Sequence, residues 1–357
     1  MRVFQHVDEF KLGDGIGNDI IGIDRVLKEI DLESYIVCKK TEENRPNLFS
    51  LELERNFHPK DIHILHYGGY GYPIDYFYKL NGKKILRFHN ITPSYFFEPF
   101  VTKDLFDLIR FNEIRSKFEL VSLGLNVDLI LFDSAFNQTT FLEILPFDPK
   151  KLNKNLVIPI FKTYHQSISK KVSKNLKIGF VGRFAPNKKI EDLVFLTYYL
   201  SKINRFYRLV LVGKPIPAFE GYYKYILELI ESLGLNSNVE MFHSLADKEV
   251  IEKMEEMDFF VSMSEHEGFG IPLLESLAIG IPTIAYSIPA TKETLKDSGV
   301  LLFQKDYKYI AELIDYLNSH PWLKQKIINQ QYKSVDYYIQ YPFLNIMKEI
   351  FQNTLFQ

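Results

Sequence analysis

Ser264-Glu-His-Glu-Gly-Phe-Gly-Ile-Pro-Leu-Leu-Glu-Ser-Leu-Ala-Ile-Gly-Ile-Pro282 decides the fold of this chain, because it joins a predicted strand to a predicted helix through a glycine turn. The apolar run at 258–263 predicts a buried parallel strand, and residues 272–278 predict a helix with proline in its first turn. The segment also sets two carboxylates, Glu267 and Glu275, eight positions apart. Free N–H groups at such a helix start can hold a phosphate, and a carboxylate further in can accept hydrogen bonds from ribose hydroxyls.

Short apolar runs that end in glycine or polar turns recur along the chain and alternate with helical patterns. This alternation predicts an α/β protein with parallel sheets and crossover helices. The predicted strands lie at 3–7, 34–38, 62–66, 84–88, 129–132, 176–181, 208–212, 239–242, 259–263, 282–286 and 299–303. A length of 357 residues with 46% hydrophobic content exceeds one ordinary core and fits two domains.

Composition narrows the classes of partner. A net charge of -2 gives no whole-protein attraction to nucleic acid or to an anionic membrane. The single cysteine, Cys38, lies in a predicted strand and indicates a core thiol in a reducing compartment. The sequence shows neither a signal peptide nor a long apolar span, so we expect a cytoplasmic protein. Peripheral contact with the inner face of the membrane stays open, and Lys150, Lys151 and Lys154 are a candidate basic surface for it.

A second motif, Gly182-Arg-Phe-Ala-Pro-Asn-Lys188, follows a predicted strand and precedes a helical pattern. Arg183 and Lys188 can converge on one anion, because a guanidinium forms paired hydrogen bonds and an ammonium acts as a point charge. A departing nucleoside diphosphate is such an anion. Lys189 is a neighbouring candidate that could substitute for Lys188.

The loop at 12–20 is rich in glycine and follows the first predicted strand. Gly15 and Gly17 carry no side chain, so the backbone there is open to close approach. Asn18 occupies the place of the third glycine of a dinucleotide-binding loop, which argues against a dehydrogenase. A purely structural turn is the alternative.

Two single side chains end other predicted strands. His89 follows the run at 84–88, where a core role is the alternative to a functional one. Lys214 follows the run at 208–212, and it could contact a phosphate or a base or equally face water.

Together these motifs resemble retaining family 4 glycosyltransferases with the GT-B fold. Glu267 and Glu275 match the E-x7-E signature, residues 182–188 match its Gly-Arg-x4-Lys element, and residues 89–93 match a His-Asn-Ile-Thr-Pro string of mannosyltransferase-like members. The resemblance implies two Rossmann-like domains with a cleft between them, and a last helix that returns to the first domain. The expected organisation is an acceptor-side domain at 1–160 plus about 338–357, a linker at 161–175 and a nucleotide-sugar-binding domain at 176–337.

The resemblance also implies roles for the site residues. Arg183 and Lys188 would stabilise the leaving diphosphate, and Glu275 would bind ribose. Glu267 would meet sugar hydroxyls, and His89 would hydrogen-bond the transferred sugar. The remaining expected contacts to the nucleotide sugar are Gly15, Gly17, Lys214, Gly268, Phe269, Gly270 and Ile271.

The implied reaction is transfer of a hexose, with mannose slightly favoured, from a GDP- or UDP-sugar to a glycan or lipid-linked acceptor. Cell-envelope or exopolysaccharide synthesis is the expected setting, with no nucleic acid partner. No D-x-D triplet or zinc-type spacing appears, so we expect no cofactor and a metal-independent mechanism. Three alternatives stay open: a sugar-nucleotide epimerase, a phosphorylase, and a catalytically silent GT-B scaffold subunit.

Overall fold

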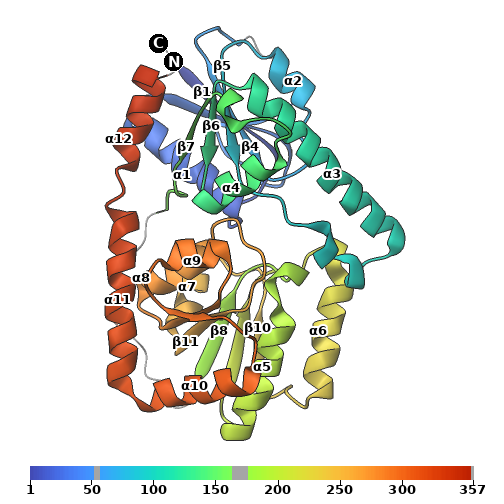
Figure 1. Ribbon diagram of the computed structural model, residues 1–357, viewed down its shortest axis with the longest axis vertical. Coiled ribbons are helices and arrows are strands. Elements are labelled where there is room, and N and C mark those ends of the chain that lie inside the picture. The colour runs from blue at the N-terminus through green and yellow to red at the C-terminus, as the bar shows by residue number, and fades with distance from the viewer. Residues whose placement is uncertain (52–56, 163–175, 355–357) are drawn as a thin grey trace. The chain divides into compact units, whose positions relative to one another are not determined.

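The computed structural model describes residues 1–51, 57–162 and 176–354, so most of the expected linker lies outside the described residues. The chain folds into two compact units. The N-terminal unit comprises Met1–Ile91, Ile109–Thr163 and Tyr341–Gln357, and the C-terminal unit comprises Thr92–Leu108 and Tyr164–Gln340. Each unit is built around its own parallel sheet (Figure 1).

The sheet of the N-terminal unit has seven described strands in the order β3-β2-β1-β4-β5-β6-β7, and neighbouring strands are parallel. Because these neighbouring strands are parallel, the carboxyl ends of β1, β4, β5 and β6 meet at one edge. The strands are β1 (Arg2–Phe10), β2 (Glu33–Thr41), β3 (Leu48–Ser50), β4 (Ile62–Tyr67), β5 (Lys83–Phe88), β6 (Leu129–Phe132) and β7 (Lys154–Val157).

Side chains of alternate strand residues point to opposite faces of the sheet and pack there in separate cores. Ile85 and Leu129 pack with α1 and α12, whereas Leu86 and Ile130 pack with α3 and α4. Figure 1 shows α12 beside α1, although they lie at opposite ends of the chain. The helices are α1 (Gly15–Glu29), α2 (Ile74–Lys79), α3 (Lys103–Asn126), α4 (Ala135–Ile144) and α12 (Phe343–Lys348), and a π-helix at Glu349–Thr354 follows α12.

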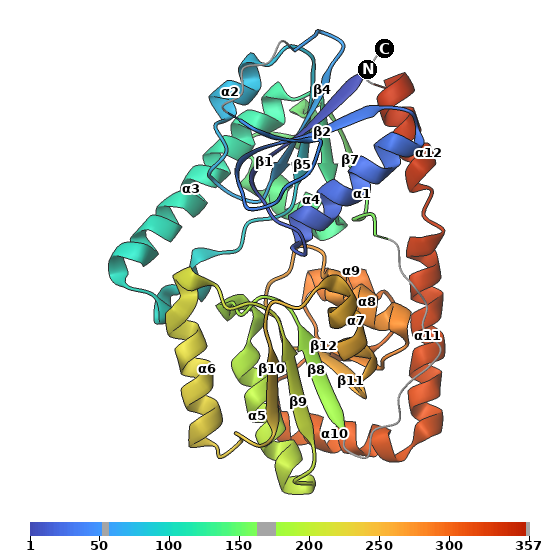
Figure 2. The same ribbon diagram turned by 180° about the vertical axis from the view of Figure 1, so that it is seen from behind.

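The sheet of the C-terminal unit has six described strands in the order β10-β9-β8-β11-β12-β13, again with parallel neighbours (Figure 2). The direct pairing of β8 with β11 brings together the ends of two strands that are far apart in sequence. The strands are β8 (Lys177–Val181), β9 (Arg208–Val212), β10 (Val239–Phe242), β11 (Phe259–Ser262), β12 (Thr283–Tyr286) and β13 (Val300–Leu302).

One large core fills the C-terminal unit between its sheet and the helices α5, α6 and α10. Helix α8 contacts β11 and β12, and α11 packs on α8. Glycine at 270 in the left-handed region starts α8, and Gly280 in the same region ends it. The helices are α5 (Ile190–Ile203), α6 (Glu220–Ser232), α7 (Asp247–Glu255), α8 (Ile271–Ile279), α9 (Pro289–Leu295), α10 (Tyr307–Ser319) and α11 (Pro321–Ile339).

Residues Thr92–Leu108 belong to the C-terminal unit, although they follow β5 in the sequence. Aromatic contacts hold them there: the rings of Phe97 and Phe219 stack at 4.4 Å, and Phe100 meets Tyr222 edge-on at 4.8 Å. This segment therefore differs from the expected continuous block at 1–160.

The predicted α/β class and all eleven predicted strands are confirmed. The sequence did not predict β3 and β7, which are short, lie at the two edges of the sheet and are not fully buried. Edge strands carry a weaker apolar signal, because only part of each strand faces the core.

Candidate functional site

Two loops of the C-terminal unit meet where β8 and β11 end. Lys188 Nζ lies 2.5 Å from Glu267 Oε2, and both side chains are largely buried. Asn187 Nδ2 donates to the carbonyl of His266 at 3.0 Å, and the N–H of Glu265 donates to the carbonyl of Asn187 at 2.9 Å. These bonds bring the motif at 182–188 and Glu267, the first carboxylate of E-x7-E, into one cluster. The cluster forms because β8 and β11 are parallel neighbours, so the loops that follow them lie at the same edge of the sheet.

The adjacent lysines at 188 and 189 have different partners. Lys189 adopts a left-handed backbone conformation, with φ 52° and ψ 50°. Its ammonium lies 3.4 Å from Glu191 and 3.7 Å from Glu265. Burial lowers the pKa of Lys189, but the carboxylates of Glu191 and Glu265 outweigh this and raise it overall. Lys188 is therefore the lysine that the structure places on Glu267.

Arg183 and Lys214 are exposed on neighbouring loops at the carboxyl ends of β8 and β9. The N–H of Phe184 donates to the carbonyl of Lys214 at 3.0 Å and ties the loops together. Gly213 permits this approach, because a Cβ there would lie 1.8 Å from the carbonyl oxygen of Gly182. Both predicted cations thus lie at the ligand-binding edge of an α/β sheet.

The second carboxylate, Glu275, is buried within α8 with 9% of its surface exposed. Residues of the turn before Glu275 have packing roles. Phe269 and Ile271 are buried, and the carbonyl of Phe269 accepts a hydrogen bond from Thr294 Oγ1. The structure therefore shows packing roles for Phe269 and Ile271, and it leaves their predicted backbone contacts, with those of Gly268 and Gly270, as predictions.

Lys305 supports the Glu265 side of this cluster, and the sequence did not single it out. Its ammonium lies 2.6 Å from both Asp192 and Glu265 and 4.6 Å from the ring centre of Tyr286. Tyr307 donates a further hydrogen bond to Asp192 at 2.7 Å. No motif surrounds Lys305, so only the fold identifies it as a support of the loop that carries Glu267.

His89 lies in a separate polar cluster at the carboxyl edge of the N-terminal sheet. Its Nε2 is 3.0 Å from His66 Nδ1, and its Nδ1 is 3.2 Å from Asp133 Oδ2. His66 in turn contacts Gln5 at 3.0 Å. Both ring nitrogens of His89 already have protein partners, so a hydrogen bond from His89 to a sugar would have to replace one of them.

Asp19 of α1 lies beside the two histidines. The guanidinium of Arg87 donates to both of its carboxylate oxygens, at 2.7 and 3.0 Å. Although burial raises the pKa of Asp19, Arg87 and the neighbouring His89 bring it below its ordinary value. Ligand-type atoms of Asp19, His66 and His89 lie within 4.8 Å of one another. A metal ion there would compete with the buried guanidinium for the same carboxylate, so we assign this cluster to hydrogen bonding.

The glycine-rich loop forms the start of α1. Asp14 caps the helix, because its Oδ1 accepts from the N–H of Gly17 at 2.6 Å. A Cβ at Gly17 would lie 1.8 Å from the carbonyl oxygen of Lys11, so packing requires this glycine. A Cβ at Gly15 would meet nothing within 4 Å. Of the two predicted contacts, Gly15 is therefore the one whose backbone faces open space.

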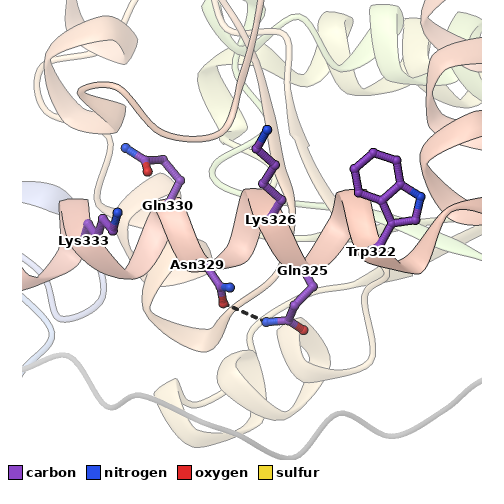
Figure 3. A pocket seen from close by; sticks show the side chains of 6 residues that line it. All are labelled: Trp322, Gln325, Lys326, Asn329, Gln330 and Lys333. Carbon is purple, nitrogen blue, oxygen red and sulfur yellow. Dashed lines mark hydrogen bonds between the residues drawn. The ribbon is translucent and has the colours of Figure 1, made fainter.

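A hollow on α11 is lined by side chains from this one helix (Figure 3). Gln325 Nε2 donates to Asn329 Oδ1 at 2.9 Å within it. The lining includes none of the predicted site residues and no carboxylate. Its residues are Trp322, Gln325, Lys326, Asn329, Gln330 and Lys333.

Part of this chain is similar to a known family. Residues 161–334 match the family model described as "Glycosyl transferases group 1". A curated relative from Xanthomonas oryzae pv. oryzae, named GDP-mannose:cellobiosyl-diphosphopolyprenol alpha-mannosyltransferase, is 28% identical over 143 residues, which are 40% of this chain and 37% of the relative. The match thus spans well under half the length of that relative.

Solved structures match over nearly the whole chain. WaaG, a glycosyltransferase involved in lipopolysaccharide biosynthesis, has a TM-score of 0.71 at 13% identity and covers 98% of this chain and 100% of its own. HepE from Anabaena, solved with UDP and glucose, has a TM-score of 0.69 at 14% identity over 99% of both chains. At sequence identities of 13% and 14%, these similarities show the fold alone. The structural similarity confirms the predicted GT-B fold, and the family match confirms the resemblance to group 1 glycosyltransferases.

Within the described residues, no helix is both long and apolar enough to span a bilayer.

Proposed function

We propose that this protein transfers a hexose from a nucleotide sugar to a glycan or lipid-linked acceptor, because residues 161–334 match the family model of group 1 glycosyl transferases. The contact between Lys188 and Glu267 is the observation that carries the proposal. It joins a diphosphate-binding cation to a carboxylate suited to sugar hydroxyls. Nothing in that pair favours epimerisation, phosphorolysis or a silent scaffold.

The proposed donor site lies in the C-terminal unit. Arg183 and Lys188 would stabilise the negative charge that develops on the diphosphate as the glycosidic bond breaks. Glu275 would accept hydrogen bonds from ribose, and Glu267 would turn from Lys188 to the sugar when the diphosphate takes its place. This exchange keeps the buried ammonium paired in both states, which limits the cost of desolvation.

The finer assignments are part of the same proposal. We favour GDP-mannose over UDP-sugars, because the Xanthomonas relative is named for that donor, although HepE was solved with UDP. The acceptor would be a lipid-linked or cell-envelope glycan, which fits the names of that relative and of WaaG. We propose retention of anomeric configuration and charge stabilisation by protein cations and helix N-termini rather than by a metal. Cytoplasmic location with peripheral contact at the inner membrane face would give access to such an acceptor.

A transfer assay tests the function. Purified protein is incubated with GDP- or UDP-hexoses and a polyprenyl-diphosphate-linked oligosaccharide, and both nucleoside diphosphate release and glycosylated acceptor are measured. We expect the two products in equal amounts. Donor conversion without acceptor would indicate an epimerase instead, and cleavage that requires inorganic phosphate would indicate a phosphorylase. Failure to bind any nucleotide sugar would identify a silent scaffold.

A further inference from the structure

Two hydroxyl groups hold the turn that precedes α8. Thr294 of α9 donates a hydrogen bond from its Oγ1 to the carbonyl of Phe269. The hydroxyl of Tyr338, in α11, lies 3.1 Å from the carbonyl of Glu293 and 3.2 Å from that of Thr294. Carbonyls in the last turn of a helix have no intrahelical partner, so Tyr338 satisfies the end of the helix that presents Thr294. The two hydroxyls therefore act in series on Phe269.

The side chain of Phe269 is held by the same helices. Its ring meets that of Tyr338 edge-on, with the ring centres 5.9 Å apart and an interplanar angle of 89°. Only 5% of Phe269 and 1% of Thr294 are exposed. Rotation of the Phe269 carbonyl away from Thr294 would leave a buried polar group without its partner, which is costly. The orientation of this peptide group is therefore fixed from the side of α9 and α11.

That orientation sets the direction of the next N–H group. The Phe269–Gly270 peptide bond is trans, and in a trans peptide the carbonyl and the N–H point in opposite directions. With the Phe269 carbonyl directed at Thr294, the Gly270 N–H points away from α9. Gly270 is buried, and its N–H has no acceptor among the described residues. A buried N–H without a partner is rare, which makes this group a candidate for contact with a bound molecule.

Helix α11 also holds the other end of α8. The side-chain amide of Gln331 donates from Nε2 to the carbonyl of Ile281 at 2.8 Å, and its Oε1 accepts from the N–H of Thr283 at 2.9 Å. Both partners follow α8 closely in the sequence, whereas Tyr338 serves the turn before it. Gln331 and Tyr338 are separated by about two turns and lie on one face of α11. Helix α11 thus runs antiparallel beside α8 and holds both of its ends (Figure 1).

We propose that Thr294 and Tyr338 are positioning residues for the donor site: through the Phe269 carbonyl they direct the Gly270 N–H toward the diphosphate of the nucleotide sugar. An N–H that is already oriented needs no rearrangement when the anion binds, so less of the binding free energy is lost. The contact with the donor rests on the proposed function. The orientation of the turn is a property of the free protein and can be measured without a ligand.

The sequence allows this turn to be observed by NMR. Phe269–Gly270 is the only Phe-Gly pair of the chain, so full-length protein labelled with carbonyl-carbon-13 phenylalanine and nitrogen-15 glycine gives one carbonyl-to-nitrogen correlation. Thr294→Val should move the Phe269 carbonyl signal upfield, because a carbonyl that loses a hydrogen bond becomes more shielded. Thr294→Ser keeps the hydroxyl and should retain the wild-type signal. A wild-type signal in Thr294→Val would overturn the proposal.

Thr197→Val is the matched control for the loss of a buried threonine hydroxyl. Thr197 is also 1% exposed, and its Oγ1 donates to the carbonyl of Leu193 at 2.7 Å within α5. This variant should lower the melting temperature to a similar extent as Thr294→Val and leave the Phe269 signal unchanged. An equal upfield shift in both variants would show that the signal follows general loss of stability, and it would contradict the assignment of Thr294.

Binding measurements connect the turn to the donor. We expect Thr294→Val and Tyr338→Phe to raise the Kd for GDP or UDP, measured by calorimetry, by about three- to tenfold, which is the effect of one lost hydrogen bond. Thr294→Ser and Thr197→Val should bind as the wild-type protein does. A wild-type Kd in both Thr294→Val and Tyr338→Phe would refute the positioning role, and a wild-type Kd in Tyr338→Phe alone would remove that residue from it. If the Phe269 signal responds as expected but the wild-type protein binds neither nucleotide, the proposed function fails and the hold on the turn stands.

Discussion

Lys188 Nζ and Glu267 Oε2 lie 2.5 Å apart, although 79 positions separate the two residues in the sequence. The pairing of β8 with β11 causes this contact, since it sets the loops after the two strands side by side. Under the proposed function, a diphosphate would take the place that this carboxylate occupies beside the ammonium.

Removal of the charge at 188 should suppress turnover. Lys188→Gln is expected to lower kcat by roughly 10²–10³-fold, the usual cost of losing one preorganised group that stabilises developing charge. Lys189→Gln is the matched control, since its ammonium pairs with Glu191 and Glu265 instead. Steady-state kinetics of both variants check this. Equal losses in the two would contradict the assignment of Lys188.

Arg183 should matter for catalysis and not for folding. Its side chain is exposed, so Arg183→Ala should change the free energy of unfolding by no more than about 0.5 kcal/mol. Turnover should nevertheless fall at least tenfold, because the leaving diphosphate loses a bidentate partner. Arg205→Ala, at another exposed arginine, is the control. Normal kinetics in a folded Arg183→Ala protein would refute the role.

Loss of the buried carboxylate in α8 should weaken nucleotide binding. Glu275→Gln keeps the shape of the side chain but removes its charge, and hydrogen bonds to charged groups are worth about 1.5–3 kcal/mol. We expect at least a tenfold rise in the Kd for the nucleoside diphosphate, measured by calorimetry, with the melting temperature recorded alongside. An unchanged Kd in a folded variant would exclude the ribose role.

Acid should destabilise the N-terminal unit through its buried histidines. The pKa of His63 is lowered to about 4 by burial, whereas in the unfolded chain it returns to about 6.5. The unfolded state therefore binds the proton first as the pH falls, and stability is lost between about pH 6.5 and pH 4, by about 3 kcal/mol for this group alone. Urea denaturation at several pH values measures the loss. His63→Gln should reduce the pH dependence, whereas a change at the exposed His58 should not.

The close approach of two loops makes Gly213 essential for folding. Gly213→Ala would drive its new methyl group into the carbonyl of Gly182, and we expect a loss of at least about 2 kcal/mol in the free energy of unfolding. Gly15→Ala is the matched control, because a methyl group there meets nothing within 4 Å. Thermal denaturation compares the two, and equal melting temperatures would contradict this account of the loops.

Much of the fold could be predicted from local sequence. The strand at 129–132 is a continuous apolar run whose residues are all buried, and such a run is recognisable without tertiary information. The placement of Thr92–Leu108 in the C-terminal unit was not predictable, because it depends on aromatic contacts with residues more than a hundred positions away. Short edge strands were missed for lack of an apolar pattern.

The amino-acid sequence by itself determined the α/β class, eleven of the thirteen described strands and the two charged motifs of the C-terminal unit, since each depends on residues within one short stretch. The tertiary structure decided which side chains meet. Lys188 rather than Lys189 reaches Glu267, and His66 and Asp133 contact His89, because strand order and backbone direction select partners that sequence spacing does not. Hydrogen-bond direction and buried charge balance then follow from those partners, and they exist only in the folded protein.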